Sequence, residues 1–359
     1  MQYTLGGFYA SIYGQAANVA SSLMLASPGT ITNPGQSFHP YYFNPAASVC
    51  PVYQQPIQGT GRLAGKCGLP SGESCDNCCS FAGHCTSDMK YCGAPMCLFE
   101  YGLACDANTW PAGQDTYDIP RPQLGNVQYG KPFRHCSVKG TIALTFDDGP
   151  GAWTEDLLDI LKSNNVKATF FITGNNLSKG HINHPATGYP DIIRRTYEEG
   201  HQIAAHTWSH MNMNFLSSKQ RIEEMVKTEI ALNDILGFFP TYWRPPYNAC
   251  NDDCATDMAN LGYHTTSYDI DPLDWQNNVT YSKENFLEAI TSRKPSERSW
   301  LSLAHDLHKG TVHEFTQFMI DHAREQGFKP VRLGECLDDP EENWYRKRST
   351  GGGGFLPKV

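Results

Sequence analysis

The chain has 359 residues, enough for one large domain plus a small one, and 40% of them are hydrophobic, so a sizeable core is possible. A formal net charge of −9 argues against a general affinity for nucleic acid or for an anionic membrane surface, and no apolar run approaches the length of a membrane-spanning helix. This charge does not oppose a neutral polysaccharide as the partner.

The first segment, residues 1–61, is rich in Gly, Pro, Ser, Asn and Tyr and lacks periodicity, which predicts an irregular extension. A secretory leader is not visible there, because its best apolar stretch, 19–26, is short and interrupted by serines. Cys50 has no evident partner, and a free thiol or a bond to another chain remain the alternatives.

A cysteine cluster follows in residues 62–106, and most of the 13 cysteines of the chain lie in it. This density indicates a disulfide-stabilised module, since so small a unit cannot bury enough apolar surface to fold alone. We therefore expect a secreted protein, extracellular or in the cell wall, whose leader has been removed. Glycosylation sequons at Asn176 and Asn278 give this expectation weak support.

The remaining chain divides into a predicted linker, 107–135, a domain, 136–338, and a flexible tail, 339–359. Strands alternating with amphipathic helices, here predicted at 153–162, 219–236 and 312–326, indicate βαβ units. About seven such units favour a distorted (β/α) barrel over an open sheet. The apolar runs that predict strands are 142–146, 168–172, 202–205, 241–243, 265–268, 300–304 and 330–333.

Two polar motifs follow apolar runs of this domain. The first carries Asp147 and Asp148, and the second carries His206 and His210, one helical turn apart. Carboxylate and imidazole ligands suit a divalent ion such as zinc or cobalt, and three of them leave a position open for water. The second carboxylate would then be free to act as a base. Because these residues follow predicted strands, we expect them at the carboxyl ends of the strands, where such barrels place active sites.

Three more motifs complete an ordered set: Arg244-Pro-Pro-Tyr247, Asp271-Pro-Leu-Asp274-Trp275 and Leu303-Ala-His305. In this order the five motifs resemble the polysaccharide deacetylase domain of carbohydrate esterase family 4, the NodB-like deacetylases, over residues 138–335. The probability that all five motifs match by chance is very low. The resemblance implies a metal-dependent hydrolase that removes the acetyl group from N-acetylglucosamine units.

The same resemblance implies the chemical roles of the motif residues. Asp148, His206 and His210 match the metal ligands. Asp147 matches the general base that takes a proton from the attacking water. His305 matches the general acid that protonates the leaving amine.

Further roles implied by the family concern the surroundings of these groups. Arg244 matches the residue that tethers the base, and Asp274 the partner that tunes the acid by opposite charge. The backbone N–H of Tyr247 matches an oxyanion donor. Trp275 and Leu303 match the wall of a pocket for the acetyl methyl group.

Taken singly, several of these residues also have structural interpretations. Arg244 could be a surface residue before a turn, Tyr247 a core phenol and Trp275 plain packing. Once the five motifs are considered together, only Asp271 and Trp208 keep a mainly structural interpretation, Asp271 as a cap of the turn that follows it.

The cysteine cluster resembles a hevein-like chitin-binding domain, carbohydrate-binding module family 18. Its most specific part is Cys78-Cys79-Ser80, followed by Gly83 and Cys85. Spacing alone leaves the pairing open. The resemblance implies the disulfides Cys67–Cys79, Cys75–Cys85, Cys78–Cys92 and Cys97–Cys105.

The expected chitin-binding face departs from that family. Ser80 and Tyr91 are retained and Phe81 is one place out of register, but Ala82 and His84 stand where the family has aromatic residues. Sugars stack on aromatic faces, so we expect weak or altered chitin binding. The alternative is that the module is mainly a disulfide-stabilised spacer.

Four other cysteines are predicted to form two bonds. Cys250 and Cys254 are close enough for a local disulfide. Cys136 and Cys336 flank the large domain, and a bond between them would join its ends.

The leading functional hypothesis is a monomeric chitin or chito-oligosaccharide deacetylase with no nucleic-acid or membrane partner. A peptidoglycan N-acetylglucosamine deacetylase and an acetylxylan esterase are the enzyme alternatives, since these classes share the motifs. The non-enzyme alternative is a cell-wall chitin-binding protein on an inactive scaffold. The presence of every proposed ligand, base and acid argues against it.

Overall fold

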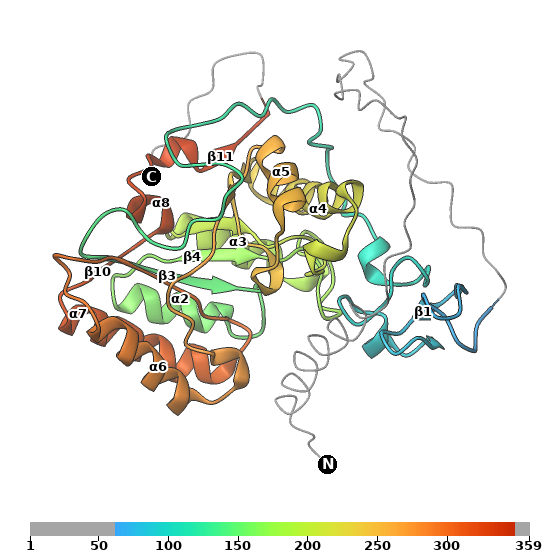
Figure 1. Ribbon diagram of the computed structural model, residues 1–359, viewed down its shortest axis with the longest axis horizontal. Helices are drawn as coiled ribbons and strands as arrows, with labels where there is room; N and C mark the ends of the chain where they lie inside the picture. The colour runs from blue at the N-terminus through green and yellow to red at the C-terminus, as the bar shows by residue number, and fades with distance from the viewer. Residues whose placement is uncertain (1–61, 349–359) are drawn as a thin grey trace.

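The structure is a computed structural model that describes residues 62–348. The expected N-terminal extension, Cys50 and residues 349–359 lie outside the described residues. Figure 1 shows two units: a small cysteine module, residues 62–106, at one end in blue, and a large barrel domain, residues 136–348. No helix in this part of the chain is both long and apolar enough to cross a bilayer.

The barrel domain is built on a seven-stranded sheet whose paired neighbours all run parallel. The strand order is β10-β3-β4-β5-β7-β8, and β9 also pairs with β3. The strands are β3 (Thr141–Asp147), β4 (Thr169–Ile172), β5 (Gln202–Ala205), β7 (Tyr242–Trp243), β8 (His264–Thr265), β9 (Trp300–Ser302) and β10 (Lys329–Val331).

The strand β3 pairs with β4, β9 and β10, and its residues are all buried. A strand that is covered on both faces needs a nearly continuous apolar run, which Ile142–Phe146 supplies. A bridge between Ile270 and Ser302 joins the chain after β8 to β9, so the sheet curls back toward its own start. The prediction of a distorted barrel of about seven parallel strands is therefore confirmed.

Helices cover the outside of the curled sheet, with α2, α6 and α7 along one side and α4 and α5 on the other (Figure 1). The ends of α4 are set locally: Ser217 and Gln220 form a capping box, and Gly237 ends the helix with a φ of 80°. A π-helical turn, Thr311–Phe315, precedes α7. The helices are α2 (Thr154–Ser163), α3 (Tyr189–Glu198), α4 (Ser218–Leu236), α5 (Asp252–Asn260), α6 (Val279–Thr291), α7 (Thr316–Glu325) and α8 (Leu333–Cys336).

Residues 339–348 belong to the barrel domain, so the expected tail was placed too early in the chain. The strand β11 (Tyr345–Arg346) pairs antiparallel with β6 (Phe239–Pro240). Trp344 is 1% exposed and packs in a core with Leu333. The basic residues that suggested a tail therefore follow Trp344, which is buried in the barrel domain.

Residues 107–135, the expected linker, connect the two units but are fixed along the barrel domain. Thr116 and Arg121 both donate to the buried carboxylate of Glu229, each at 2.6 Å. Ile119 is 3% exposed in the main core. The segment is therefore an ordered strap and not a free tether.

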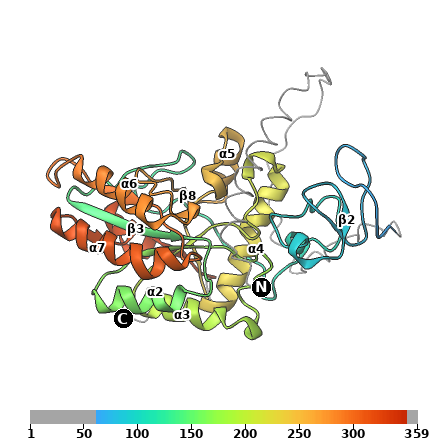
Figure 2. The ribbon, with the colours of Figure 1, turned by 90° about the horizontal axis from the view of Figure 1, so that it is seen from below.

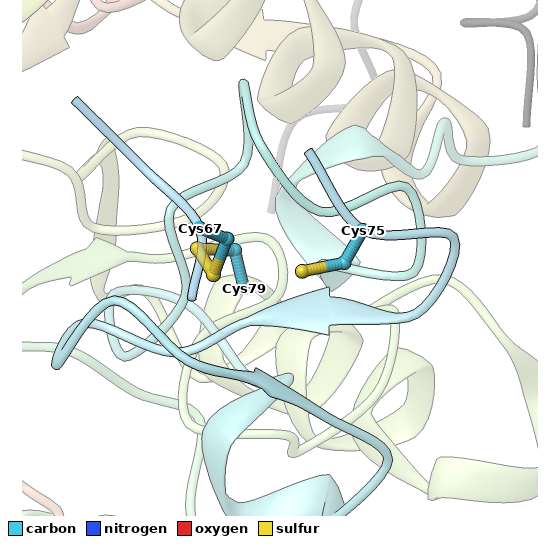
Figure 3. Close-up of side chains that lie close together, drawn as sticks. All are labelled: Cys67, Cys75 and Cys79. Carbon is cyan, nitrogen blue, oxygen red and sulfur yellow. A yellow bond between two sulfur atoms is a disulfide. The ribbon is translucent and has the colours of Figure 1, made fainter. Parts of the chain in front are cut away.

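The cysteine module has a short antiparallel pair, β1 (Cys78–Cys79) and β2 (Cys85–Thr86). Its disulfides are Cys67–Cys79, Cys75–Cys85, Cys78–Cys92 and Cys97–Cys105, the same pairs that the hevein resemblance implies. Figure 3 shows Cys75 beside the Cys67–Cys79 bond. Although these three sulfur atoms gather closely, all are oxidised, so none is a thiolate that could hold a metal.

The module and the barrel domain share a hydrophobic core. Ala94, Cys97 and Cys105 of the module pack in one cluster with Met211 and Met213 of the barrel domain. Figure 2 again shows the module beside α4, on the side away from α7.

Two disulfides and two sequons lie in the barrel domain. Cys136–Cys336 joins the start of the domain to the last residue of α8, and Cys250–Cys254 is the local bond. Asn176 is 1% exposed and accepts from the Thr173 hydroxyl, so this sequon is not open to glycosylation in the folded chain. The sequon at Asn278 is exposed, where the side chain caps α6.

Candidate active site

A cavity of about 250 Å³ lies at the carboxyl ends of the strands. Residues from each of the five motifs reach it, although those motifs are spread over the whole barrel domain. This is the edge of the sheet where the sequence predicted the active site. The lining residues are Asp147, His206, His210, Arg244, Pro245, Tyr247, Asn248, Tyr268, Asp271, Trp275, Leu303 and His305.

Asp148, His206 and His210 form a group of three potential metal ligands, whose ligand atoms lie within 4.8 Å of one another. Asp148 Oδ1 is 3.4 Å from His206 Nε2 and 3.1 Å from His210 Nε2. All three residues are buried, and Asp148 Oδ1 makes no hydrogen bond within residues 62–348. A buried carboxylate oxygen that lacks a donor and faces two imidazole nitrogens fits a divalent cation.

The surroundings of these ligands favour the forms that bind a metal. His206 Nδ1 lies 2.7 Å from the main-chain oxygen of Arg244, which leaves Nε2 directed toward Asp148. Burial alone would raise the pKa of the Asp148 carboxyl, but His210 and His206 hold this pKa well below its usual range. The carboxyl group is therefore ionised, as a metal ligand must be.

Asp147, the last residue of β3, is paired with Arg244, which follows β7. Arg244 Nη1 donates to Asp147 Oδ1 at 2.7 Å and to the Thr145 hydroxyl at 2.8 Å, while Nη2 donates to the Ser267 carbonyl at 2.9 Å. The guanidinium also stacks 4.1 Å from the centre of the Phe171 ring. Arg244 is 1% exposed, so it is not the surface residue of the structural alternative.

His305 and Asp274 form a second charged pair on the other side of the cavity. Asp274 Oδ1 lies 2.9 Å from His305 Nδ1, and Asp274 Oδ2 accepts from the His305 main-chain N–H at 2.7 Å and from the Thr311 hydroxyl at 2.8 Å. Burial would lower the pKa of His305, but the negative charge of Asp274 outweighs it and raises this pKa to about 10. The imidazole is therefore a proton donor at neutral pH.

The remaining motif residues are Tyr247, Trp275, Leu303 and Asp271, which line the cavity, and Trp208, which does not. Tyr247 has a left-handed φ of 58° and is 39% exposed, so it is not a core phenol. Trp275 and Leu303 both line the cavity. Asp271 accepts from the Leu273 N–H at 2.9 Å and caps that turn, though it also lines the cavity. Trp208 is fully buried in the main core, which agrees with its structural interpretation.

Sequence reasoning missed several residues of the site. Tyr268 and Asn248 line the cavity, and each lies within three residues of a motif, a position that could have drawn attention to it. Lys179 and Asp306 lie against the metal-ligand loop, residues 148–149, which follows β3 and carries the proposed ligand Asp148. Lys179 belongs to no motif and gave no signal in the sequence.

The residues expected to bind chitin lie on the cysteine module. Phe81 is 39% exposed and His84 is exposed, whereas Ser80 is 6% exposed and its hydroxyl accepts from the His84 main-chain N–H. The Lys90 ammonium lies 4.7 Å from the centre of the Tyr91 ring. Among the Phe, Tyr and Trp residues of the module, only Phe81 is therefore exposed, and it stands at the position that is out of register.

The chain is similar to known polysaccharide deacetylases in both sequence and structure. A model of the family described as polysaccharide deacetylase matches residues 134–266. A chitin deacetylase of Colletotrichum lindemuthianum is 42% identical over 224 residues, which is 61% of this chain and 88% of that protein. A chitin deacetylase of Pestalotiopsis sp is 39% identical, over 66% of this chain and 76% of that protein. The solved structure of the Colletotrichum lindemuthianum enzyme matches with a TM-score of 0.57 at 41% identity, covering 61% of this chain and 96% of that chain.

Proposed function

Because the chain belongs to the polysaccharide deacetylase family, we propose that it is a metal-dependent chitin deacetylase. It hydrolyses the N-acetyl group of N-acetylglucosamine units in chitin or chito-oligosaccharides, giving acetate and chitosan. The observation that carries this proposal is that one cavity is lined by an Asp–Arg pair, by the imidazole of an Asp–His pair and by two of the three potential metal ligands, His206 and His210.

The two charged pairs divide the proton transfers between them. Asp147, held by Arg244, accepts a proton from the attacking water, and His305, held by Asp274, gives a proton to the departing amine nitrogen. An amine leaves well only when it is protonated, so the acid is as necessary as the base. The main-chain N–H of Tyr247 stabilises the oxyanion, and Trp275 and Leu303 receive the acetyl methyl group.

Asp148, His206 and His210 hold the metal in this proposal. Zinc is the ion that the ligand types favour, and cobalt suits the same set. Such an ion, when bound, polarises the carbonyl oxygen of the amide and makes water more acidic.

The cysteine module is proposed to be a hevein-like unit that binds chitin weakly, because Phe81 is the one exposed residue among its Phe, Tyr and Trp side chains. We also propose an extracellular or cell-wall location. Six disulfides persist in an oxidising compartment and are rare in the cytosol.

Acetate release tests the function directly. The full chain is incubated with N-acetylglucosamine oligomers, peptidoglycan and acetylxylan, before and after treatment with a chelator, and then with zinc restored. We expect release from the chitin oligomers that stops with the chelator and returns with zinc. Release from peptidoglycan or acetylxylan alone would reassign the substrate, and no release with zinc present would support the inactive scaffold.

A further inference from the structure

Lys179 lies against the metal-ligand loop and is not part of any motif. Its ammonium donates to the main-chain oxygens of Asp148 and Gly149, at 3.1 and 3.0 Å, and to the Thr173 hydroxyl at 2.8 Å. The first of these oxygens belongs to the residue whose carboxylate faces His206 and His210. One cation therefore fixes the backbone from which a proposed ligand projects.

The loop after β3 needs such support because its conformation is unfavourable. Asp148 has a φ of 77°, in the left-handed region that side chains other than glycine rarely adopt. Gly149 follows with no room for a side chain, since a Cβ there would lie 2.2 Å from Asp306 Oδ2. The same Asp306 oxygen accepts from the Thr154 hydroxyl at 2.6 Å. The loop is thus held between Lys179 and Asp306.

The cysteine module supports the segment that carries Lys179. Leu177 and Ser178 both have left-handed backbones, with φ of 54° and 59°. The Leu177 N–H donates to the main-chain oxygen of Ala94 in the module at 2.6 Å. A Cβ on Gly93 would lie 2.1 Å from Ser178 Oγ and 2.7 Å from Ser178 N, so the two backbones touch with no space for a side chain.

We propose that Lys179 is a positioning residue for the metal site, and that the cysteine module holds it in place through the contact of Gly93 and Ala94 with Leu177 and Ser178. The proposal rests on the metal-dependent function proposed above. It gives the module a role in the chemistry that does not depend on whether the module binds chitin.

Lys179 can influence the strength of metal binding in two opposite ways. An ammonium repels a divalent cation, which would weaken metal binding, whereas fixing the ligand backbone strengthens it. Burial disfavours the charged form of Lys179, which reduces this repulsion, although the nearby carboxylates of Asp306 and Asp148 favour that form. We therefore expect positioning to prevail.

Zinc affinity of the metal-free full chain, measured in competition with a chromophoric chelator, distinguishes these effects. In the variant Lys179→Met we expect zinc to bind about 10–100-fold more weakly, the usual effect of losing a residue that orients a ligand. The control Lys162→Met removes an exposed lysine that pairs with Glu199, and should bind zinc like the parent chain. Unchanged or tighter zinc binding by Lys179→Met would overturn the proposal.

Two glycine variants test the part played by the module. Gly93→Ala pushes against Ser178, and we expect it to weaken zinc binding in the same direction as Lys179→Met. Gly72→Ala is the matched control, because it strains the module at a φ of 67° while its Cβ would meet nothing within 4 Å. If Gly93→Ala binds zinc as tightly as Gly72→Ala, the module has no such role.

A stability measurement separates positioning from folding. The melting temperature of each metal-free variant is recorded, since a purely structural role would lower it and leave the zinc affinity of the folded chain unchanged, which would also overturn the proposal. Zinc binding is measured without substrate. A failure of the chitin deacetylase assignment therefore does not affect this test, and the two can be told apart.

Discussion

The two proton-transfer groups of the proposed site each have one buried partner of opposite charge. Arg244 holds Asp147 through a bond of 2.7 Å, and Asp274 lies 2.9 Å from His305. Both partners also bond other groups of the barrel, so neither can turn away from the cavity. A base and an acid can then work at the same pH because their environments differ.

The first prediction concerns the division of labour between the two adjacent carboxylates. Replacing Asp147 with Asn should lower kcat by about 10²–10⁴-fold, the usual contribution of a general base. Zinc binding should persist, because Asp148, His206 and His210 remain. Acetate release and zinc content are measured on the same preparation, and Asp148→Asn is the matched control that should lose zinc. Loss of zinc from Asp147→Asn would mean that the two roles are exchanged.

The second prediction concerns the pH dependence set by Asp274. The pKa of His305 is raised to about 10 by this carboxylate, so the proton donor is present below that pH and activity falls as the pH rises through it. In Asp274→Asn the negative charge that raises the pKa of His305 is gone, so burial lowers this pKa. The basic limb of the kcat profile should then move to lower pH by about one to two units.

Asp271→Asn is the control for this profile. Asp271 also lines the cavity, but it caps a turn and makes no hydrogen bond to His305 among the described residues. Because the charge of Asp271 also acts on His305, its basic limb should move to lower pH, but by less than that of Asp274→Asn. An Asp274→Asn profile that matches the control would remove Asp274 from its proposed role.

At the scale of elements, the sheet brings motifs together that are far apart in the chain. Asp147 ends β3, His206 follows β5 and Arg244 follows β7. In the sheet β4 lies between β3 and β5, and β7 pairs with β5 on its other side. The strand runs and the motifs that follow them were visible in the sequence because parallel strands are buried on both faces. The position of the cavity could therefore be predicted before the structure was known.

Other parts of the fold could not be predicted, because they depend on contacts between distant segments. Lys179 acts through main-chain oxygens of another loop, which no side-chain pattern records. The strap is fixed by Glu229, far along the chain in α4. The residues around Trp344 carry many charges and little periodicity, so they resembled a tail.

The third prediction tests this last element. Trp344 is 1% exposed and donates from Nε1 to the Asp339 carbonyl at 3.0 Å. Replacing it with Ala should lower the free energy of unfolding by about 3–5 kcal/mol, as for other buried tryptophans. Thermal unfolding should then shift down by about 10 °C. The control Tyr281→Ala, at a side chain that is 41% exposed, should shift it by about 1–2 °C. Equal shifts of the melting temperature in the two variants would mean that residues 339–348 are a tail and not part of the barrel domain.

At the scale of the whole molecule, the cysteine module is part of one body with the barrel domain. Its Ala94, Cys97 and Cys105 share a core with Met211 and Met213, which lie within three residues of the proposed ligand His210. The Glu100 carboxylate also accepts from the Gln220 side chain at 2.6 Å. A chitin chain held by this module would therefore meet the cavity at a fixed angle.

The last prediction concerns the effect of pH on this shared interface. Burial raises the pKa of Asp106 to about 7, and the charge of Glu224 adds to the rise, while the hydrogen bond from the Ala94 N–H acts against it. Because the folded chain holds this proton more tightly than the unfolded chain does, its contribution to stability is complete below about pH 4 and is lost as the pH rises toward 7. Asp106→Asn cannot ionise and should escape this loss. Between pH 5 and pH 8 the free energy of unfolding of the parent chain should therefore fall by about 2 kcal/mol relative to that of the variant.

Calorimetry of the full chain at both pH values measures the difference. Asp88→Asn, which replaces an exposed carboxylate of the same module, is the matched control that should follow the parent chain. If the Asp106→Asn curve also follows the parent chain, ionisation of Asp106 does not weaken the contact between the module and the barrel domain.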